Sequence, residues 1–350
     1  MSIRRLSALF LCAALMLCAF SGCNADKKPL VQTETYYDFF DTVTLVISYA
    51  EDSPEVFNAN ASAVSSLFSE YHKLFDIYHT YSGINNLKTV NDSAGKAPVK
   101  VDKRLIDFLI YAKEIYTLTN GATNVAMGSV LSLWHREREL YAEDPSKASV
   151  PSSDSLSKAS KHTDISSIVI DEETETVYIS DPDVRIDVGA LGKGYATERA
   201  AELLVSRGVT SYVLNVGGNL RAIGQKPNGE GFITGITDPD KKDGGDFICK
   251  VNLKNSSLVT SGNYERYYTV GEKSYHHIID PKTNMPAEFF SSVSVFTSDS
   301  GLADALSTAL FCMNYEDGKA LVSAVGSTEV IWVTLDGKLL YTQGVDFYSK

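Results

Sequence analysis

Cysteine is scarce in this chain and unevenly placed. Three of the 5 cysteines lie within the first 23 residues, which leaves only Cys249 and Cys312 for the other positions. Two cysteines are too few for a disulfide framework, and no Cys-x-x-Cys spacing suggests a metal site. Stability must therefore come from a large buried core, and a content of 44% apolar residues is enough to supply one.

Positive charge is also in short supply. The chain has 32 Lys and Arg residues against 44 Asp and Glu residues, a formal net charge of −12. Nucleic-acid binding requires basic side chains that neutralise phosphates, so we expect no nucleic-acid partner. No polybasic cluster is present to attract an anionic membrane surface. Any membrane attachment would therefore depend on a lipid rather than on charge.

Long apolar runs are absent except near the start of the chain. Residues 1–22 contain two arginines, an apolar stretch at 6–20 and a small-residue end, the pattern of a secretory signal. The stretch is shorter than the roughly 20 residues that span a bilayer. Ser21-Gly22-Cys23 resembles a bacterial lipobox, although Phe20 replaces the usual aliphatic residue. We expect a lipid on Cys23 and an extracytoplasmic protein anchored to the bacterial cell membrane; secretion with Cys23 as a free thiol is the alternative.

The rest of the chain shows no repeat at a fixed period and no linker long enough to divide it. Residues 23–34 are polar and are predicted to be a tether, and residues 35–350 a single domain. Short β-branched segments outnumber helical patterns, which predicts an α+β domain of mostly antiparallel strands with inserted helices. Helices are predicted at about 54–79, 102–119, 192–207 and 299–313, and a second short helix follows the last of these. Residues 141–164 are predicted to be a surface excursion. Strands are predicted at 42–49, 166–170, 176–179, 184–188, 211–216, 219–224, 231–236, 247–253, 257–261, 264–270, 274–280, 291–296, 329–335 and 338–342.

The common nucleotide-binding signatures are missing too, since neither GxxxxGK[ST] nor GxGxxG occurs at a strand-to-helix turn. Instead, RIDVGALGKGYA (185–196) places three glycines around Lys193 between a predicted strand and a predicted helix. Such a turn can cradle a phosphate at a helix N-terminus, or it can be a tight connection only. A second glycine pair, in LNVGGNLRAIG (214–224), favours a hairpin turn.

The helix predicted at 299–313 carries an unusual polar pair. Asp304 and Thr308 are four residues apart, so their side chains lie on one face, opposite a stripe of leucines. Their neighbours on that face include no Lys, Arg or Glu and are Ser300, Ser307 and Phe311. This composition indicates a face covered by something small and polar. A carboxylate and a hydroxyl are oxygen ligands that suit Mg²⁺, so the pair permits a metal site.

Two adjacent histidines lie in a predicted strand. Side chains alternate along a strand, so only one of His276 and His277 can face a given site. A lone strand histidine is more often a packed or surface residue than a functional one. The strand predicted from residue 257 ends in Thr260, Ser261 and Gly262, whose hydroxyls and amides could face a ligand.

These stretches together resemble the ApbE family, the FAD:protein FMN transferases. The resemblance runs from about residue 36 to 343. It rests on eight segments that occur in order: FFDTVT (39–44), INNLKTVNDSAG (84–95), GATNVAMGSVLSLW (121–134), DVGALGKGYA (187–196), NVGGNLRAIG (215–224), TSGNYERYY (260–268), HIIDP (277–281) and LADALSTAL (302–310).

The resemblance implies an activity. A family member of this kind uses Mg²⁺ and FAD to attach FMN to a threonine of a target flavoprotein through a phosphoester bond, with release of AMP. The target carries a Ser/Thr-Gly-Ala-Thr-like segment; TNGATNV (119–125) in this chain is similar but overlaps a family landmark, so self-modification is not expected. Two other functions are compatible with the sequence: a Mg²⁺-dependent FAD pyrophosphatase and a lipid-anchored FAD-binding protein without chemistry.

The resemblance also implies roles for particular residues. Asp304, Ser307, Thr308 and the backbone carbonyl of Ala190 would hold Mg²⁺. Asp304 and His277 would be catalytic, with His277 as the general base because an unperturbed pKa near 6.5 suits that role. The family commonly has Gly-Ala-Phe-Asp at 121–124, so this chain lacks an aromatic ring and a charge there. The FAD-contacting positions would be Phe40, Asn91, Ala122, Thr123, Asn124, Asp187, Lys193, His277 and Ile278.

Overall fold

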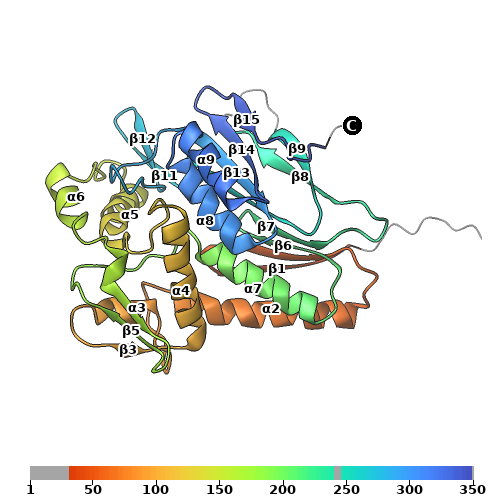
Figure 1. Ribbon diagram of the computed structural model, residues 1–350, viewed down its shortest axis with the longest axis horizontal. Helices are drawn as coiled ribbons and strands as arrows, with labels where there is room; N and C mark the ends of the chain where they lie inside the picture. Colours follow the sequence, from red (N-terminus) through yellow and green to blue (C-terminus); the bar gives the residue numbers. More distant parts are fainter. Residues whose placement is uncertain (1–30, 240–245, 349–350) are drawn as a thin grey trace, which may run out of the picture.

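The computed structural model describes residues 31–239 and 246–348. Its main element is an antiparallel eight-stranded sheet, in the order β1-β2-β6-β7-β10-β13-β14-β15 (Figure 1). The predicted α+β class is confirmed. The strands are β1 (Gln32–Phe39), β2 (Thr42–Ser48), β6 (Ser211–Val216), β7 (Asn219–Gly224), β10 (Ser257–Gly262), β13 (Phe290–Thr297), β14 (Glu329–Thr334) and β15 (Leu339–Tyr341).

Four helices cover one face of this sheet: α2 (Pro54–Phe75), α7 (Gly192–Ser206), α8 (Ser300–Phe311) and α9 (Tyr315–Val325) (Figure 1). α8 packs on β10 and β13, and α7 lies against α8, α2 and β7. The N-terminus of α8 is fixed by Asp299, whose side chain accepts a hydrogen bond from the Leu302 N–H at 2.8 Å. The sheet therefore sets the position of α8, which carries Asp304 and Thr308.

A two-stranded ribbon, β8 (Phe232–Thr237) and β9 (Phe247–Leu253), covers the opposite face of the sheet. Because side chains alternate along a strand, those on one face of the sheet belong to one hydrophobic core and those on the other face belong to a second. Leu258 and Ile331 pack with the ribbon, whereas their neighbours Val259 and Val330 pack with α8. Both faces of the central strands are thus buried, so that even polar residues on them, such as Ser292 and Ser294 of β13, are almost fully enclosed.

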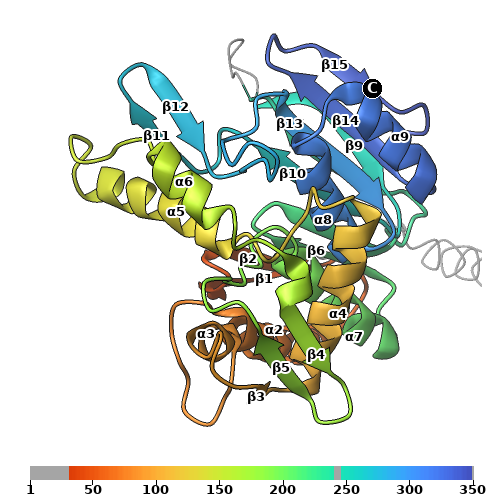
Figure 2. The same cartoon turned by 60° about the vertical axis from the view of Figure 1, so that its left-hand side comes forward.

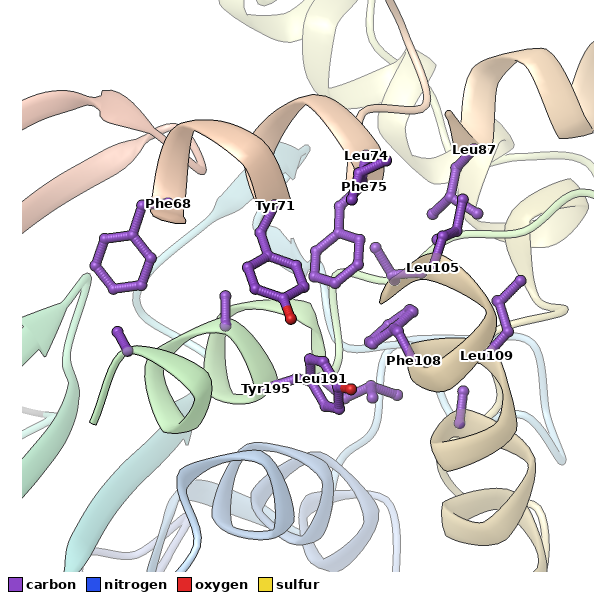
Figure 3. Close-up of a cluster of buried hydrophobic side chains, with 14 of the residues drawn as sticks. Phe68, Tyr71, Leu74, Phe75, Leu87, Leu105, Phe108, Leu109, Leu191 and Tyr195 are labelled. Atoms are coloured by element: carbon purple, nitrogen blue, oxygen red, sulfur yellow. The ribbon is translucent and has the colours of Figure 1, made fainter. Parts of the chain in front are cut away.

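A second lobe lies beside the helices (Figure 2). Phe75 of α2 stacks on Phe108 with ring centroids 4.2 Å apart, and the Tyr195 ring of α7 packs edge-on against Phe108 (Figure 3). This aromatic cluster joins the lobe to the helices that cover the sheet. The lobe comprises α3 (Leu87–Asp92), β3 (Val99–Lys100), α4 (Lys103–Leu118), α5 (Gly128–Glu143), α6 (Ser153–Ala159), a short 3₁₀ turn (Ile165–Ser167), β4 (Ile168–Asp171), β5 (Thr176–Ile179), β11 (Tyr267–Val270) and β12 (Lys273–His276).

The described residues correct several sequence-based boundaries. Residues 32–34, predicted as tether, begin β1 and pair with β2. α2 ends at Phe75 rather than near 79, because the Asp76 side chain accepts the N–H groups of Tyr78 and His79 and turns the chain. The segment 184–188 is extended but forms no strand. The excursion 141–164 contains the end of α5 and all of α6, and the strands predicted at 264–270 and 274–280 are shorter.

The predicted signal 1–22, the lipidation site Cys23 and tether residues 24–30 lie outside the described residues. Within the described part of the chain, no helix combines the length and apolarity needed to cross a membrane.

A buried ion pair connects α7, β7 and the start of α8. Arg221 donates to both carboxylate oxygens of Glu198, at 2.9 and 3.1 Å, and the Ser300 N–H donates to the same carboxylate at 2.7 Å. Both side chains are less than a tenth exposed. Loss of the carboxylate would leave the guanidinium buried without its counter-charge.

We expect Glu198→Gln to lower the free energy of unfolding by about 3 kcal/mol, measured by urea denaturation. Glu202→Gln is the matched control on the same helix, because Glu202 pairs with Arg199 at 2.8 Å in contact with solvent. The control should change stability by less than about 1 kcal/mol. Equal losses in the two variants would contradict a structural role for the buried pair.

Candidate active site

A cavity of about 640 Å³ opens where the sheet, α8 and the second lobe meet. Asp304 and Thr308 of α8 face it, and Lys193 from the first turn of α7 lies in its wall. Predicted site residues that line the cavity are Phe40, Ala122, Thr123, Asn124, Asp187, Ala190, Lys193, His277, Ile278, Asp304 and Thr308. The fold therefore brings together segments that lie far apart in the sequence.

Asp304 is a carboxylate held almost out of solvent, with 4% of its surface exposed. The Gly194 N–H donates to its Oδ2 at 2.8 Å. This contact requires glycine, because a Cβ at residue 194 would lie 2.3 Å from the Ser300 carbonyl oxygen and 2.4 Å from the Asp304 Cβ. Burial raises the pKa of Asp304, and the Lys193 ammonium acts in the opposite direction. A cation in the cavity would relieve this desolvation.

Oxygen atoms suited to such a cation surround Asp304. Thr308 follows one helical turn later on the same face, as predicted. The Gly194 N–H belongs to the first turn of α7, where N–H groups have no acceptor within the helix, and it donates to Asp304. Ala190 precedes this turn and lines the cavity, so its carbonyl is a further candidate oxygen ligand. A carboxylate, a hydroxyl and a carbonyl form an all-oxygen donor set, which fits Mg²⁺.

Asn219, the first residue of β7, was not predicted as a site residue. Its side chain is only 3% exposed, lines the cavity and has an Nδ2 without a hydrogen-bond partner. The Asn219 amide lies close enough to Asp304 to lower the pKa of that carboxyl, although no hydrogen bond of normal geometry joins them. An unpaired buried donor is costly, so it points to an acceptor supplied by a ligand. The only sequence signal was its position after Gly217-Gly218, which indicated a hairpin turn.

His277 faces the cavity, while its neighbour faces away. The His277 Nδ1 lies 3.3 Å from the Arg266 carbonyl oxygen, which can only accept, so the proton belongs on Nδ1 and Nε2 keeps a lone pair. Burial, followed by the positive charges of Arg266 and Arg138, lowers the pKa of His277 to about 3. The His276 ring instead packs edge-on against Phe311. Only one of the two histidines thus faces the cavity, as expected, but β12 ends at His276, so the predicted strand does not include both residues.

Cations gather around Asp187 at the cavity wall. The Asp187 Oδ1 accepts the Gly189 N–H at 2.9 Å, which shapes the glycine turn. Burial raises the pKa of Asp187, and the nearby charges of His135, Arg138 and Arg266 lower it. Among the described residues, Arg138 and Arg266 form no ion pair within 4.0 Å. These two guanidinium groups can therefore contact an anionic ligand at this wall.

Two predicted contact residues do not line the cavity. The Asn91 side chain is buried and exchanges two hydrogen bonds with the Ile186 backbone, at 2.9 and 2.8 Å, so it holds the segment that leads to Asp187. The Ser307 hydroxyl donates to the Asp304 carbonyl at 2.9 Å and lies 2.8 Å from the Ser261 Oγ, because residue 307 is turned from the cavity toward β10. Both residues support the site from behind.

Thr123 and Asn124 line the cavity, but their side-chain polar groups bind the protein. The Thr123 hydroxyl donates to the Ala305 carbonyl of α8 at 2.8 Å. The Asn124 amide donates to the Thr163 carbonyl at 2.9 Å and accepts the Ala126 N–H at 2.9 Å. Thr123 and Asn124 are thus fixed by hydrogen bonds to α8 and to the loop that contains Thr163.

This chain is similar to several known proteins. The sequence profile of the ApbE family matches residues 40–332. A curated FAD:protein FMN transferase of Klebsiella pneumoniae is 29% identical, and the match covers 79% of this chain and 82% of that protein. A curated FAD:protein FMN transferase of Treponema pallidum is 31% identical, and the match covers 74% of this chain and 73% of that protein. The crystal structure of the ApbE protein of Thermotoga maritima is 29% identical and superposes with a TM-score of 0.77, covering 89% of this chain and 97% of that one.

Proposed function

Because the chain belongs to the ApbE family, we propose that it is a Mg²⁺-dependent enzyme that transfers FMN from FAD to a threonine of a target flavoprotein. The observation that carries the proposal is the buried Asp304 carboxylate, which faces the cavity together with Thr308, while the cations Lys193, Arg138 and Arg266 lie in the cavity wall. Curated relatives carry the name FAD:protein FMN transferase. A target with a Ser/Thr-Gly-Ala-Thr-like segment is part of the proposal.

The proposed reaction exchanges one phosphorus–oxygen bond for another. The threonine oxygen attacks the phosphorus on the FMN side of the FAD pyrophosphate, the anhydride bond breaks, and AMP leaves with the bridging oxygen. Charge spreads over the phosphoryl oxygens in such a transition state, so positioning and positive charge supply most of the catalysis. Lys193 offers a point charge at the cavity wall, and the unpaired Asn219 Nδ2 offers a hydrogen-bond donor.

A bound Mg²⁺ would neutralise the pyrophosphate and act as a Lewis acid. Asp304, Thr308 and the Ala190 carbonyl would hold it, and waters and phosphate oxygens would complete the shell. Ser307 contributes through its hydrogen bond to the Asp304 carbonyl rather than as a ligand. The Gly194 N–H orients the second carboxylate oxygen of Asp304.

His277 is the proposed general base for the threonine hydroxyl. Its Nε2 is unprotonated and accessible from the cavity, as proton abstraction requires. The low pKa of the free protein arises partly from Arg266, Arg138 and Lys193. A bound pyrophosphate would offset those charges and so raise the pKa of His277 toward the range useful for catalysis.

We place this enzyme outside the cytoplasm, tethered by a lipid on Cys23. The signal pattern of residues 1–22 and the lipobox-like Ser21-Gly22-Cys23 support that location. Mass spectrometry of the membrane fraction would detect the lipidated N-terminal peptide beginning at Cys23, whereas a free Cys23 thiol would favour plain secretion.

Incubation of the full chain, purified in detergent, with FAD, Mg²⁺ and a protein bearing a Ser-Gly-Ala-Thr segment tests the activity. We expect a fluorescent flavin band after denaturing electrophoresis, one AMP per FMN transferred, and no band when the target threonine is replaced by valine. His277→Ala should lose the band but still bind FAD. AMP with free FMN and no band would identify a pyrophosphatase, and FAD left intact would identify a binding protein.

A further inference from the structure

The ribbon on the far face of the sheet has one covered edge and one free edge. β9 pairs with β8 on one side, and on the other side it contacts the C-terminal segment. The Asn252 N–H donates to the Asp346 carbonyl at 3.0 Å, and the Tyr348 N–H donates to the Lys250 carbonyl at 2.9 Å. No strand within residues 31–239 and 246–348 pairs with the outer edge of β8. β8 is therefore the exposed edge strand of the ribbon.

The register shows which backbone groups this edge presents. Ile233 lies opposite Asn252, and Gly235 lies opposite Lys250. Since the polar backbone groups of Asn252 and Lys250 point away from β8, these two positions are non-hydrogen-bonded pairs of the antiparallel ladder. The N–H and C=O groups of Ile233 and Gly235 therefore point outward from the ribbon. A row of unpaired backbone N–H and C=O groups of this kind is a template for an additional strand.

The free edge of β8 borders the same cavity as α8. Thr234, Gly235 and Thr237 line the cavity. Thr260 and Ser261 of β10 line it as well, beyond the point where β7 pairs with β10 at Ser257 and Leu258. The Ser261 hydroxyl lies 2.8 Å from that of Ser307 on α8. A chain on the β8 edge would thus border the cavity that Asp304 and Thr308 of α8 line from the other face of the sheet.

Most of the residues that line the cavity between β8 and the end of β10 are small and polar, and the larger Tyr264, Glu265 and Arg266 follow directly after them. Gly235 has no side chain, and the Phe247 ring occupies the space where its Cβ would lie, with a closest approach of 2.1 Å. Gly262 at the end of β10 is similarly covered by the Tyr264 ring, 2.6 Å from the position of a Cβ. Hydroxyls of Thr234, Thr237 and Thr260 complete this wall. An extended segment with small side chains suits it better than a helix or a charged peptide.

We infer that the acceptor polypeptide docks on the free edge of β8 as an added strand, with its hydroxyl presented to the cavity beside Asp304 and Thr308. Main-chain hydrogen bonds to Ile233 and Gly235 would supply affinity, and the small wall would select the segment. This inference rests on the proposed transfer of FMN to a protein.

Ile233→Pro removes one outward N–H and leaves the ladder with β9 intact, because proline is tolerated at an edge strand when its N–H faces outward. Ile233→Thr is the matched control, which shortens the same exposed side chain but keeps the N–H. With the full chain and the Ser-Gly-Ala-Thr acceptor protein, the proline variant should raise the KM for the acceptor about tenfold, the effect of one or two lost hydrogen bonds. The threonine variant should retain the wild-type KM, and both should bind FAD with unchanged Kd.

Hydrogen exchange on the wild-type protein provides a second measurement that needs no variant of the enzyme. An acceptor protein with its target threonine replaced by valine would be added, so that binding occurs without transfer. The amides of Ile233 and Gly235 should exchange at least about tenfold more slowly in its presence. Equal exchange with and without acceptor, or an unchanged KM in an active Ile233→Pro enzyme, would overturn the docking inference alone. A wild-type enzyme that transfers no FMN would overturn the proposed function and this inference with it.

Discussion

Asp304→Asn is expected to reduce FMN transfer by at least about 10³-fold and, in the absence of Mg²⁺, to increase the thermal stability of the protein. The two effects have one cause. The carboxylate is buried at 4% exposure, and burial raises its pKa, so its charged form is unfavourable until a cation arrives. Asparagine has nearly the same shape, and its Oδ1 can still accept the Gly194 N–H. The variant removes the charge but not the packing.

The sign of the pH dependence follows from that raised pKa. An acid whose pKa is higher in the folded than in the unfolded chain favours folding when protonated, and that stability is lost as the pH rises through the folded-state pKa. Thermal unfolding of wild type and Asp304→Asn across a range of pH, without metal, should therefore show an advantage of the variant that grows as the pH rises through the pKa of Asp304 in the folded wild type.

The effect of added Mg²⁺ on the Tm distinguishes a role of Asp304 in metal binding from a purely structural role. The metal should raise the Tm of the wild type and leave that of Asp304→Asn unchanged, because ligand binding stabilises only the protein that binds it. Thr308→Val should show a smaller rise than the wild type. A Mg²⁺-dependent rise in Tm of equal size in Asp304→Asn would exclude this carboxylate as a ligand.

Gly194→Ala is expected to lower the free energy of unfolding by about 2–3 kcal/mol and transfer activity by about 10²-fold. The added methyl group would overlap the Ser300 carbonyl oxygen and the Asp304 Cβ, which belong to the start of a packed helix. α7 and α8 would have to separate, and the separation would move both the Gly194 N–H and the carboxylate it binds. Stability and activity should fall together.

Gly318→Ala in α9 is the control for this substitution. The nearest atom to its Cβ is the end of the flexible Leu310 side chain at 3.3 Å, and the next neighbour lies at 3.8 Å. Because alanine is also the better helix former, stability should stay the same or increase by up to about 1 kcal/mol. Urea denaturation and the FMN-transfer assay check both variants. Wild-type stability in Gly194→Ala would show that the two helices are not in tight contact there.

Local sequence was informative where a site residue lies on a regular element. Helical periodicity placed Asp304 and Thr308 on one face of α8, and both line the cavity. Of the two histidines only His277 lines the cavity, but it follows the end of β12 at His276, so strand alternation does not explain this. Periodicity is less informative about neighbouring faces. Ser307 is only one residue from Thr308, but it turns toward Ser261 and lies outside the cavity wall.

The roles of two asparagines depended on contacts with distant parts of the chain. Asn91 looked like a ligand contact, yet its amide is satisfied by the Ile186 backbone, 95 residues away in the sequence. Asn219 looked like part of a hairpin turn, yet its amide ends at the cavity without a partner. Neither outcome follows from local pattern, because the partner or its absence is decided by another part of the chain.

The sequence by itself determined the α+β class, the positions of most strands, and the acid–hydroxyl pair on α8, because these depend on apolar periods of about two and about 3.6 residues. Only the tertiary structure decided the start of β1, the turn after Phe75, the glycine contact between α7 and α8, and the free edge of β8. Those features depend on hydrogen-bond partners and steric contacts between segments far apart in the sequence. Packing, rather than local preference, therefore assembles the cavity.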